Sequence, residues 1–262
     1  MRLIGIMGGK VVSSWRNFAY VLSVTASVFW FSLFPRYWTQ TVRNVLARQI
    51  LFTGYQATKF VSILAFLVGV SVVVQVQLFT TALGQKDYLG PILVIFIFRE
   101  LGPLLVSFMI IARSGTAMAS ELATMRVTNE THVLDAQGID PFIYLVMPRV
   151  VGAAISVFCL TVIFIFVSMA SGFFIAILLG INTGTPWLFI DSIFKVLIPA
   201  DVINLLAKTL IPGALMGAIC CIEGLKVRGL STEVPQAASR AVVKSIMALF
   251  FTSALISVLM YI

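Results

Sequence analysis

Two charged residues, Arg99 and Glu100, stand side by side inside an otherwise apolar stretch of the chain. A charge in the hydrocarbon core of a membrane costs free energy, so ionisable residues within membrane-length segments usually serve a function. Neighbouring residues of a helix do not face each other, so we expect each side chain to bond to another helix, to water or to a ligand. Gly102-Pro103 follows, and a proline frees a backbone carbonyl and kinks a helix beside such a site.

Polar partners for these two charges are available in other apolar stretches. Gln75 and Gln77 lie at a comparable depth in the preceding stretch. Lys208 lies in a later one, where its amine either serves the same site or extends to the membrane surface. Three interpretations stay open: ion pairs that hold helices together, the polar lining of a cavity for an amphipathic substrate, and a proton relay.

The segment 118–138, which follows this stretch, is polar and is predicted to form one short amphipathic helix. Its apolar stripe, interrupted at Asn129, consists of Met118, Leu122, Met125, Val133 and Ala136, and its polar face of Glu121, Thr124, Thr128, Thr131 and Asp135. Gly138 and Asp140-Pro141 end the helix. The pattern is typical both of a solvated connecting helix and of a docking helix for a cytoplasmic protein.

The composition places these residues in a helical membrane protein. Of the 262 residues, 60% are hydrophobic and 11% are charged, which is too apolar for a soluble domain of this length. Within these runs, apolar residues do not alternate with polar ones, which argues against the strands of a membrane β-barrel. The net charge of +8 comes from basic residues that flank apolar runs, which is typical of membrane proteins and argues against nucleic acid as a partner.

Five stretches are long enough to cross a hydrocarbon core, which takes about 20 residues. They are Phe60–Leu83, Pro91–Ala112, Phe142–Gly180, Val202–Ile222 and Val242–Ile262. The loop Ile181–Ala200 is a candidate for a short interfacial helix. No repeat or linker divides the chain, so we expect a single membrane domain over residues 1–262.

Phe18–Phe34, within the N-terminal region 1–50, is apolar but at the lower limit of length for a span. Basic residues bracket it on both sides, and Trp15, Trp30 and Trp38 suit the headgroup level. We therefore predict an elbow helix that lies in the inner leaflet, with a spanning helix as the alternative. Five spans and a cytoplasmic N-terminus put the C-terminus on the periplasmic side.

The distribution of basic residues supports this orientation. Among the 18 Lys and Arg residues, only Lys86 and Lys195 fall on the outer side, and Arg99 and Lys208 lie within spans. All the others fall on the cytoplasmic side, as the positive-inside rule predicts. Within the fourth span, Gly213 and Gly217 form a GxxxG pattern, which is typical of close helix packing within a chain or between two copies.

The sequence gives little support for a catalytic or metal-binding motif. His132 is the single histidine and lies in the polar segment, away from the spans, and no His, Cys and Asp cluster has metal-ligand spacing. A phosphate-binding loop is also lacking, because Gly8-Gly9-Lys10-Val11 has neither the first glycine nor the hydroxyl of that motif. We expect neither an enzyme nor a cofactor in this chain; if ATP drives the protein, a partner chain binds ATP and Mg and hydrolyses the ATP.

The run from Arg99 to Arg149 resembles the central region of the MlaE-type permeases. The motifs are Arg99-Glu100-Leu101-Gly102-Pro103, the run Ala112–Ala117, Ala119-Ser120-Glu121-Leu122, Asp140-Pro141 and Pro148-Arg149, together with the C-terminal Ser239–Ser245. That family comprises membrane subunits of ABC transporters that move phospholipids with mammalian-cell-entry (MCE) domain proteins. Ser114 and Ser120 depart from the residues frequent in the family, which leaves the lipid preference open.

The resemblance implies a homodimer in a bacterial inner membrane. Each copy would contact a cytoplasmic ATPase through the segment 118–138, with Glu121, Met125, Arg126, Thr128, Asp135 and Gly138 as the expected coupling residues. A ring of MCE-domain proteins would exchange lipid on the outer side, and in some members a STAS-domain protein binds the ATPase. The substrate cavity would be lined by Arg99, Glu100, Gln75, Gln77 and Lys208.

The alternative function is a proton-coupled secondary transporter of an amphipathic substrate, in which Glu100 acts with Lys208 or Arg99. Intramembrane charges serve both classes. A secondary transporter needs no ATPase and no exposed docking helix. A requirement for docking therefore separates the two hypotheses.

Overall fold

The computed structural model describes residues 19–82, 92, 94–178 and 195–261, and in these ranges the regular elements are all helical. Most of the loop Ile181–Ala200 and also Lys86 lie outside the described residues. Five helical runs are long and apolar enough to cross a membrane: Gln40–Val76, Val94–Val127, Phe142–Ile175, Pro199–Leu225 and Ser231–Met260. The prediction of an all-α chain with five spans is confirmed.

The described helix of the N-terminal region, Ala19–Ser32, is apolar but shorter than these five. At 1.5 Å per residue it is about 21 Å long, whereas the hydrocarbon core is about 30 Å thick. Trp38 closes the turn after it, because its indole Nε1 donates to the carbonyl of Ser32 at 2.9 Å. Over the described residues this helix is short and apolar, as expected for an elbow helix.

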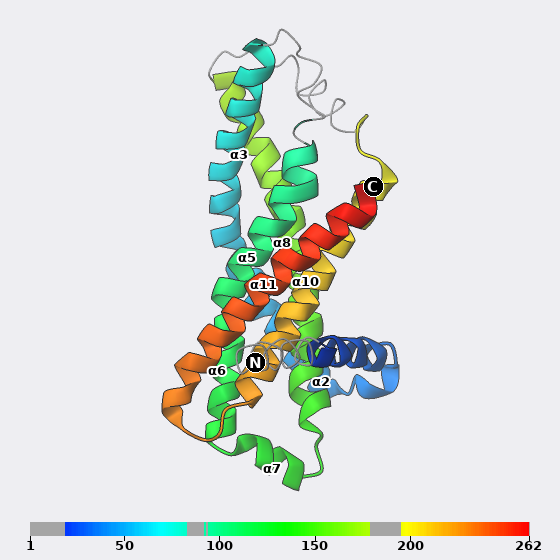
Figure 1. Cartoon of the computed structure of the whole chain (residues 1–262), viewed down its shortest axis with the longest axis vertical. Helices are drawn as coiled ribbons and strands as arrows, with labels where there is room; N and C mark the ends of the chain where they lie inside the picture. The colour runs from blue at the N-terminus through cyan, green and yellow to red at the C-terminus, as the bar shows by residue number, and fades with distance from the viewer. Residues whose placement is uncertain (1–18, 83–91, 93, 179–194, 262) are drawn as a thin grey trace, which may run out of the picture. The chain divides into compact units, whose positions relative to one another are not determined.

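The chain divides into two compact units. The first unit comprises Met1–Gln49, Ile111–Ala153 and Ala214–Ala248, and the second comprises Ile50–Ile110, Ala154–Gly213 and Leu249–Ile262. Three long helices, α8 (Met147–Leu178), α10 (Pro199–Leu225) and α11 (Val234–Tyr261), are divided between the two units, and α2 (Gln40–Ile50) passes only its last residue to the second unit. Figure 1 labels these helices.

Besides parts of the three long helices, the described part of the first unit contains eight elements, and of α2 it includes every residue except Ile50. These elements are the helix Ala19–Ser32, the 3-10 helix η1 (Pro35–Tyr37), α2 (Gln40–Ile50), the π-helix η5 (Ile111–Gly115), α6 (Thr116–Val127), α7 (Glu130–Ala136), the π-helix η6 (Phe142–Val146) and the 3-10 helix η7 (Ser231–Glu233). Its main apolar core consists of Val28, Leu122, Leu145, Val146, Met147, Val150, Ala218 and Cys221. Because Val28 is 2% exposed in that core while Phe29 is 70% exposed, Ala19–Ser32 buries one face only.

The segment 118–138 is two helices, so the prediction of one continuous helix is wrong. The chain leaves α6 at Thr128, and Asn129 takes a left-handed conformation, with φ of 61°, before α7 begins. Asparagine is one of the few residues that tolerate this conformation. The break also shifts the helical phase, since Thr131, expected on the polar face, is buried, and Val133, expected on the apolar stripe, is 55% exposed. In Figure 1, α7 lies crosswise at the end of α6.

The predicted end of this segment is confirmed at Gly138. Gly138 has φ of 74°, and its N–H donates to the carbonyl of Asp135 at 3.0 Å. The next N–H, of Ile139, donates to the carbonyl of Leu134, also at 3.0 Å. These two bonds form a Schellman motif, which satisfies the last carbonyls of α7 and needs a residue that accepts positive φ.

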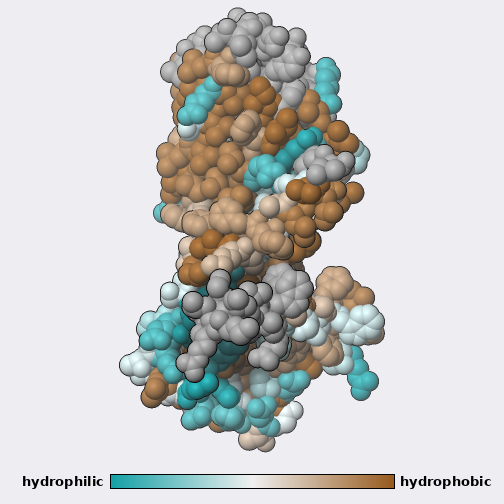
Figure 2. Space-filling model, viewed as in Figure 1, coloured by the Kyte–Doolittle hydropathy of each residue, from teal (hydrophilic) through white to brown (hydrophobic). Residues whose placement is uncertain are grey.

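The second unit contains the π-helix η2 (Leu51–Tyr55), α3 (Gln56–Ala82), the π-helix η4 (Val94–Leu101) and α5 (Gly102–Ile110). Its apolar core consists of Val73, Val94, Ile97, Ile165 and Leu205. Many large apolar side chains of α3, such as Phe60 and Phe79, are exposed, and Figure 2 shows a mostly hydrophobic visible face over this helix. Such a surface suits contact with lipid tails.

Glycines allow α3 to approach α8 very closely. A Cβ atom added at Gly69 would lie 2.5 Å from Ser168 Cα, and one added at Gly172 would lie 2.8 Å from the carbonyl of Gly69. The GxxxG pattern serves the same purpose on α10. Added Cβ atoms at Gly213 and Gly217 would each lie 2.9 Å from the Cα of an α8 residue, Ala154 and Val150 respectively. The structure thus uses this pattern for packing within the chain.

Candidate functional site

The charges predicted to lie inside the membrane form two ion pairs in the second unit. Arg99, near the end of η4, pairs with Asp201 in the first turn of α10. Its Nε lies 2.8 Å from Oδ1 of Asp201, and its Nη2 donates to Oδ2 at 3.1 Å. The Asp201 side chain is 1% exposed and that of Arg99 is 18% exposed. The Nη2 hydrogen bond is charge-assisted, and the short distance from Nε adds charge attraction between the two side chains.

Asp201 has a second role at the start of α10. Its Oδ2 accepts a hydrogen bond from the backbone N–H of Ile198 at 3.1 Å. Pro199 is the first residue of the helix and Asp201 the third, which is the arrangement in which an acidic side chain reaches back to cap a helix N-terminus. The Arg99 pair is therefore held by a carboxylate that the backbone of α10 itself orients.

The second pair joins Glu100 to Lys208. Lys208 Nζ donates to Glu100 Oε1 at 2.6 Å, and Ser257 of α11 donates its hydroxyl to the same oxygen at 3.0 Å. The Lys208 side chain is 1% exposed, whereas that of Glu100 is 42% exposed. The ammonium is therefore enclosed by protein, and the carboxylate is the part of this pair that an incoming molecule can reach.

Pro103 leaves a backbone carbonyl available to accept a hydrogen bond from Lys208. Pro103 has no N–H to donate to the carbonyl of Arg99, four residues before it. Lys208 Nζ donates to that carbonyl at 3.0 Å. The prediction that Gly102-Pro103 leaves a carbonyl available beside the charged residues agrees with this contact.

Taken together, the four side chains carry two positive and two negative charges. They connect η4 to α10 and α11 within the second unit, next to the apolar core residues Ile97 and Leu205. Because each buried charge has an oppositely charged partner, the desolvation cost is offset. We name these four residues, Arg99, Glu100, Asp201 and Lys208, the charge cluster.

The sequence prediction for this site was right about some partners and missed others. Arg99 and Glu100 do bond to another helix rather than to each other, and Lys208 joins them. Gln75 instead donates to Ser71, one turn earlier on its own helix, at 3.4 Å, and the side chain of Gln77 lies outside the described residues.

Asp201 and Ser257 were not predicted. A signal for Asp201 was present, since it lies seven residues before Lys208 and so on the same face of α10, and since it follows Pro199 at a typical capping distance. The hydroxyl of Ser257, in an apolar helix, gave no comparable signal.

The first unit holds the residues predicted to dock a partner. Glu121 of α6 pairs with Arg149 of α8, whose Nη2 donates to Glu121 Oε1 at 2.9 Å. Arg149 also donates from Nη1 to the carbonyl of Leu145 at 3.0 Å, and its side chain is 6% exposed. The Glu121 side chain is 58% exposed. A buried arginine therefore fixes the position of an exposed carboxylate on α6.

The other predicted coupling residues differ in exposure. Met125 and Arg126 are half-buried, and Arg126 Nη1 donates to the hydroxyl of Thr131 at 3.2 Å, which ties α7 to α6 across the break. Thr128, Asp135 and Gly138 are exposed. We name residues 121–140 the docking segment; Figure 2 shows mostly hydrophilic side chains at the end of the molecule where Figure 1 draws α7.

The fold and these contacts define a class: a helical membrane protein with five apolar helices, a neutralised charge cluster in one unit and an exposed polar segment in the other. Comparison with known proteins gives the family. The permease MlaE family model matches residues 46–259, and the chain belongs to this family.

Several relatives support this assignment. A probable ABC transporter permease protein of Rickettsia conorii is 30% identical over 219 residues, which is 83% of each chain. One of Synechocystis is 34% identical over 220 residues, 84% of this chain and 82% of the relative. The chloroplast protein trigalactosyldiacylglycerol 1 of Arabidopsis thaliana is 30% identical over 216 residues, 82% of this chain and 61% of that protein. The chain is therefore an ABC transporter permease, a non-catalytic membrane subunit that works with an ATPase.

Proposed function

We propose that this permease moves phospholipids between the inner membrane and a conduit of MCE-domain proteins, and so maintains the lipid asymmetry of an outer membrane. The observation that carries the proposal is the charge cluster. It brings one half-exposed carboxylate, Glu100, and an arginine, Arg99, next to the apolar core of the second unit. Polar groups bordered by apolar surface suit an amphipathic substrate.

The charge balance of the cluster indicates how it would contact a lipid. Asp201 neutralises Arg99 and Glu100 neutralises Lys208, so the cluster offers hydrogen bonds rather than net charge. Such a site suits the glycerol and ester region of a lipid, which the various phospholipid headgroups share. One relative carries the name of a galactolipid, trigalactosyldiacylglycerol, in agreement with a diacylglycerol-based substrate.

Membership of the family and the exposed docking segment support the following partners. The ATPase would bind ATP and Mg and contact the docking segment from the cytoplasm. The permease would act as a homodimer with its N-terminus in the cytoplasm and its C-terminus in the periplasm. A ring of MCE-domain proteins would stand on the periplasmic side, with a STAS-domain protein on the ATPase in some systems.

The docking role predicts the effect of a charge reversal. Asp135 is exposed on α7, so Asp135→Lys should leave the chain folded and inserted but weaken the bound ATPase at least tenfold. The measurement is co-purification of the ATPase, together with ATP-dependent transfer of a fluorescent phospholipid in proteoliposomes. Arg43→Glu, a charge reversal at an exposed residue of α2 in the same unit, is the matched control and should retain the ATPase.

An unchanged yield of ATPase with Asp135→Lys would contradict the docking assignment. Transfer that persists without ATP and follows an imposed proton gradient would contradict the function itself. The second result would favour the proton-coupled alternative. That alternative loses its main support here, since an ABC permease takes its energy from ATP and both carboxylates of the charge cluster have cationic partners.

A further inference from the structure

Three basic residues converge on one carboxylate in the first unit, and the transport proposal does not use them. Lys226 and Lys244 donate to Glu223 Oε1 at 3.0 Å and 2.9 Å. Arg240 Nε lies 3.6 Å from Glu223 Oε2. We name Lys226, Arg240 and Lys244 the basic triad.

The basic triad carries more charge than its carboxylate can neutralise. The three cations exceed the charge of Glu223 by two. The C-terminus of α10, which ends at Leu225, supplies about half a negative charge more and leaves an excess of roughly 1.5. The Glu223 side chain is only 5% exposed, whereas those of the triad are 44–47% exposed. The buried carboxylate thus holds three half-exposed cations in place for an external anion.

The triad lies where two apolar spans end. No charged residue occurs in α10 between Lys208 and Glu223, and none in α11 after Lys244. Charges therefore begin at the level of Glu223 in both helices. That is the level of lipid phosphates when the apolar parts of the helices occupy the hydrocarbon core.

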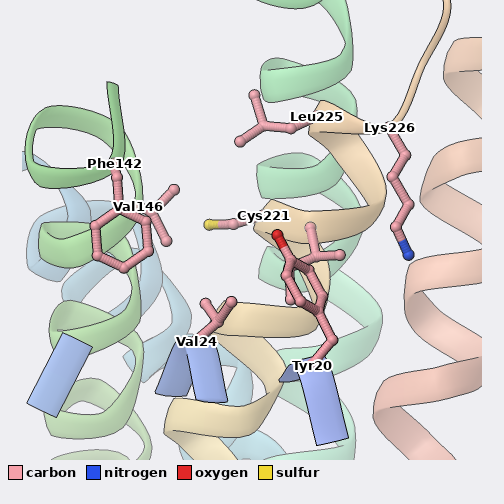
Figure 3. Close-up of a pocket in the computed structure, with 8 residues that line it drawn as sticks. Tyr20, Val24, Phe142, Val146, Cys221, Leu225 and Lys226 are labelled. Carbon is pink, nitrogen blue, oxygen red and sulfur yellow. The ribbon is translucent and has the colours of Figure 1, made fainter. Parts of the chain in front are cut away.

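An apolar pocket adjoins the triad. It has a volume of about 190 Å³ and is lined by Tyr20, Val24, Phe142, Val146, Cys221, Ile222, Leu225 and Lys226. Figure 3 shows Cys221 and Leu225 pointing from α10 toward Phe142 and Val146, with Lys226 on another side of the same helix. Lys226 belongs to both features, so a charged group at the triad and an apolar chain in the pocket can belong to one molecule.

We propose that the first unit binds an anionic phospholipid of the surrounding membrane, with its phosphate on the basic triad and part of an acyl chain in the adjoining pocket. The complementary charge favours a lipid with a net negative headgroup, such as phosphatidylglycerol, over a zwitterionic one. This bound lipid is separate from the transported substrate. It anchors the end of α10 to α11 and to the helix Ala19–Ser32 within the first unit.

The test is lipid retention by the full chain in its purified complex. Native mass spectrometry counts bound phosphatidylglycerol and phosphatidylcholine of identical acyl chains. Arg240→Gln with Lys244→Gln should lower the retention of phosphatidylglycerol about tenfold and leave phosphatidylcholine unchanged. The matched control is Arg43→Gln with Arg48→Gln, which removes two exposed cations of α2 in the same unit and should keep the preference.

A second variant tests the pocket without changing charge. Val24→Phe fills the pocket and should also lower phosphatidylglycerol retention, because the acyl chain loses its space. The proposal is wrong if the triad variant keeps its lipid preference, or if the α2 control loses as much. It is also wrong if the triad variant loses the ATPase while lipid retention stays the same, since an acidic protein surface would then be the partner. Transport activity does not enter this test, so its outcome is independent of the proposed substrate.

Discussion

At the scale of single residues, the charge cluster is asymmetric in its exposure. Lys208 is enclosed and Glu100 is half-exposed, although the two form one ion pair. Removing the partner of an enclosed charge is costly because the remaining charge has neither water nor a counter-charge. The two residues should therefore respond differently to substitution, even though they share one contact.

We expect Glu100→Gln to lower stability by roughly 3 kcal/mol, because it leaves the ammonium of Lys208 without a counter-charge. Lys208→Met should cost less, since the Glu100 carboxylate keeps the hydroxyl of Ser257 and access to water. The double variant should recover much of the loss. Thermal unfolding in detergent, analysed as a double-mutant cycle, measures the coupling.

The same variants separate structure from transport. If the double variant regains stability but transfers phospholipid poorly, the two side chains contact the substrate. Normal transfer per folded molecule would instead mean that the pair only holds η4 to α10. The double-mutant cycle and the transfer assay together therefore decide whether Glu100 and Lys208 contact the substrate or only hold the helices together.

At the scale of elements, close approach between helices depends on a few glycines. Gly69 of α3 and Gly54 of η2 both face α8 within the second unit, but their surroundings differ. At Gly69 the obstacle is backbone, Ser168 Cα at 2.5 Å, which cannot move without the helix. At Gly54 it is the hydroxyl of Ser156, 3.3 Å from the added Cβ, which can rotate.

Gly69→Ala should therefore destabilise the protein by about 1–3 kcal/mol, the usual cost of overpacking. Gly54→Ala is the matched control and should cost well under half of that. Thermal unfolding of the two variants beside the parent protein measures the difference. Equal stability of the two variants would show that α3 can shift along α8 at little cost.

At the scale of the whole molecule, the apolar run Phe142–Ile175, one of five in the part of the chain that the structure describes, separates the docking segment from residue 195. The docking segment and residue 195 should then lie on opposite sides. The basic residues favour the cytoplasm for the docking segment. Orientation is a property of the whole chain, since it depends on charges far apart in the sequence.

Cysteine labelling tests this orientation. In a variant without Cys159, Cys220 and Cys221, His132→Cys should react with a membrane-impermeant maleimide only after the cells are opened. Lys195→Cys should react in cells whose outer membrane alone is permeable. Labelling of both positions from the same side would overturn the predicted topology.

Composition and the length of apolar runs were enough to predict the helical class and five spans, because the membrane requires backbone hydrogen bonds within each segment. The motifs from Arg99 to Arg149 predicted the family. Local chemistry also predicted the end of α7, since Gly138 adopts the positive φ of a Schellman motif. All of these features depend on residues close together in the chain.

Tertiary structure decided the rest. Asp201 is 102 residues from its partner Arg99 in the sequence, and Ser257 is 157 residues from its partner Glu100. No local sequence pattern encodes contacts over such separations. The break at Asn129 changed which residues of α7 are buried, because one left-handed residue shifts the helical phase of everything after it. The sequence therefore determined the helical class and the apolar spans, and packing determined which charges meet.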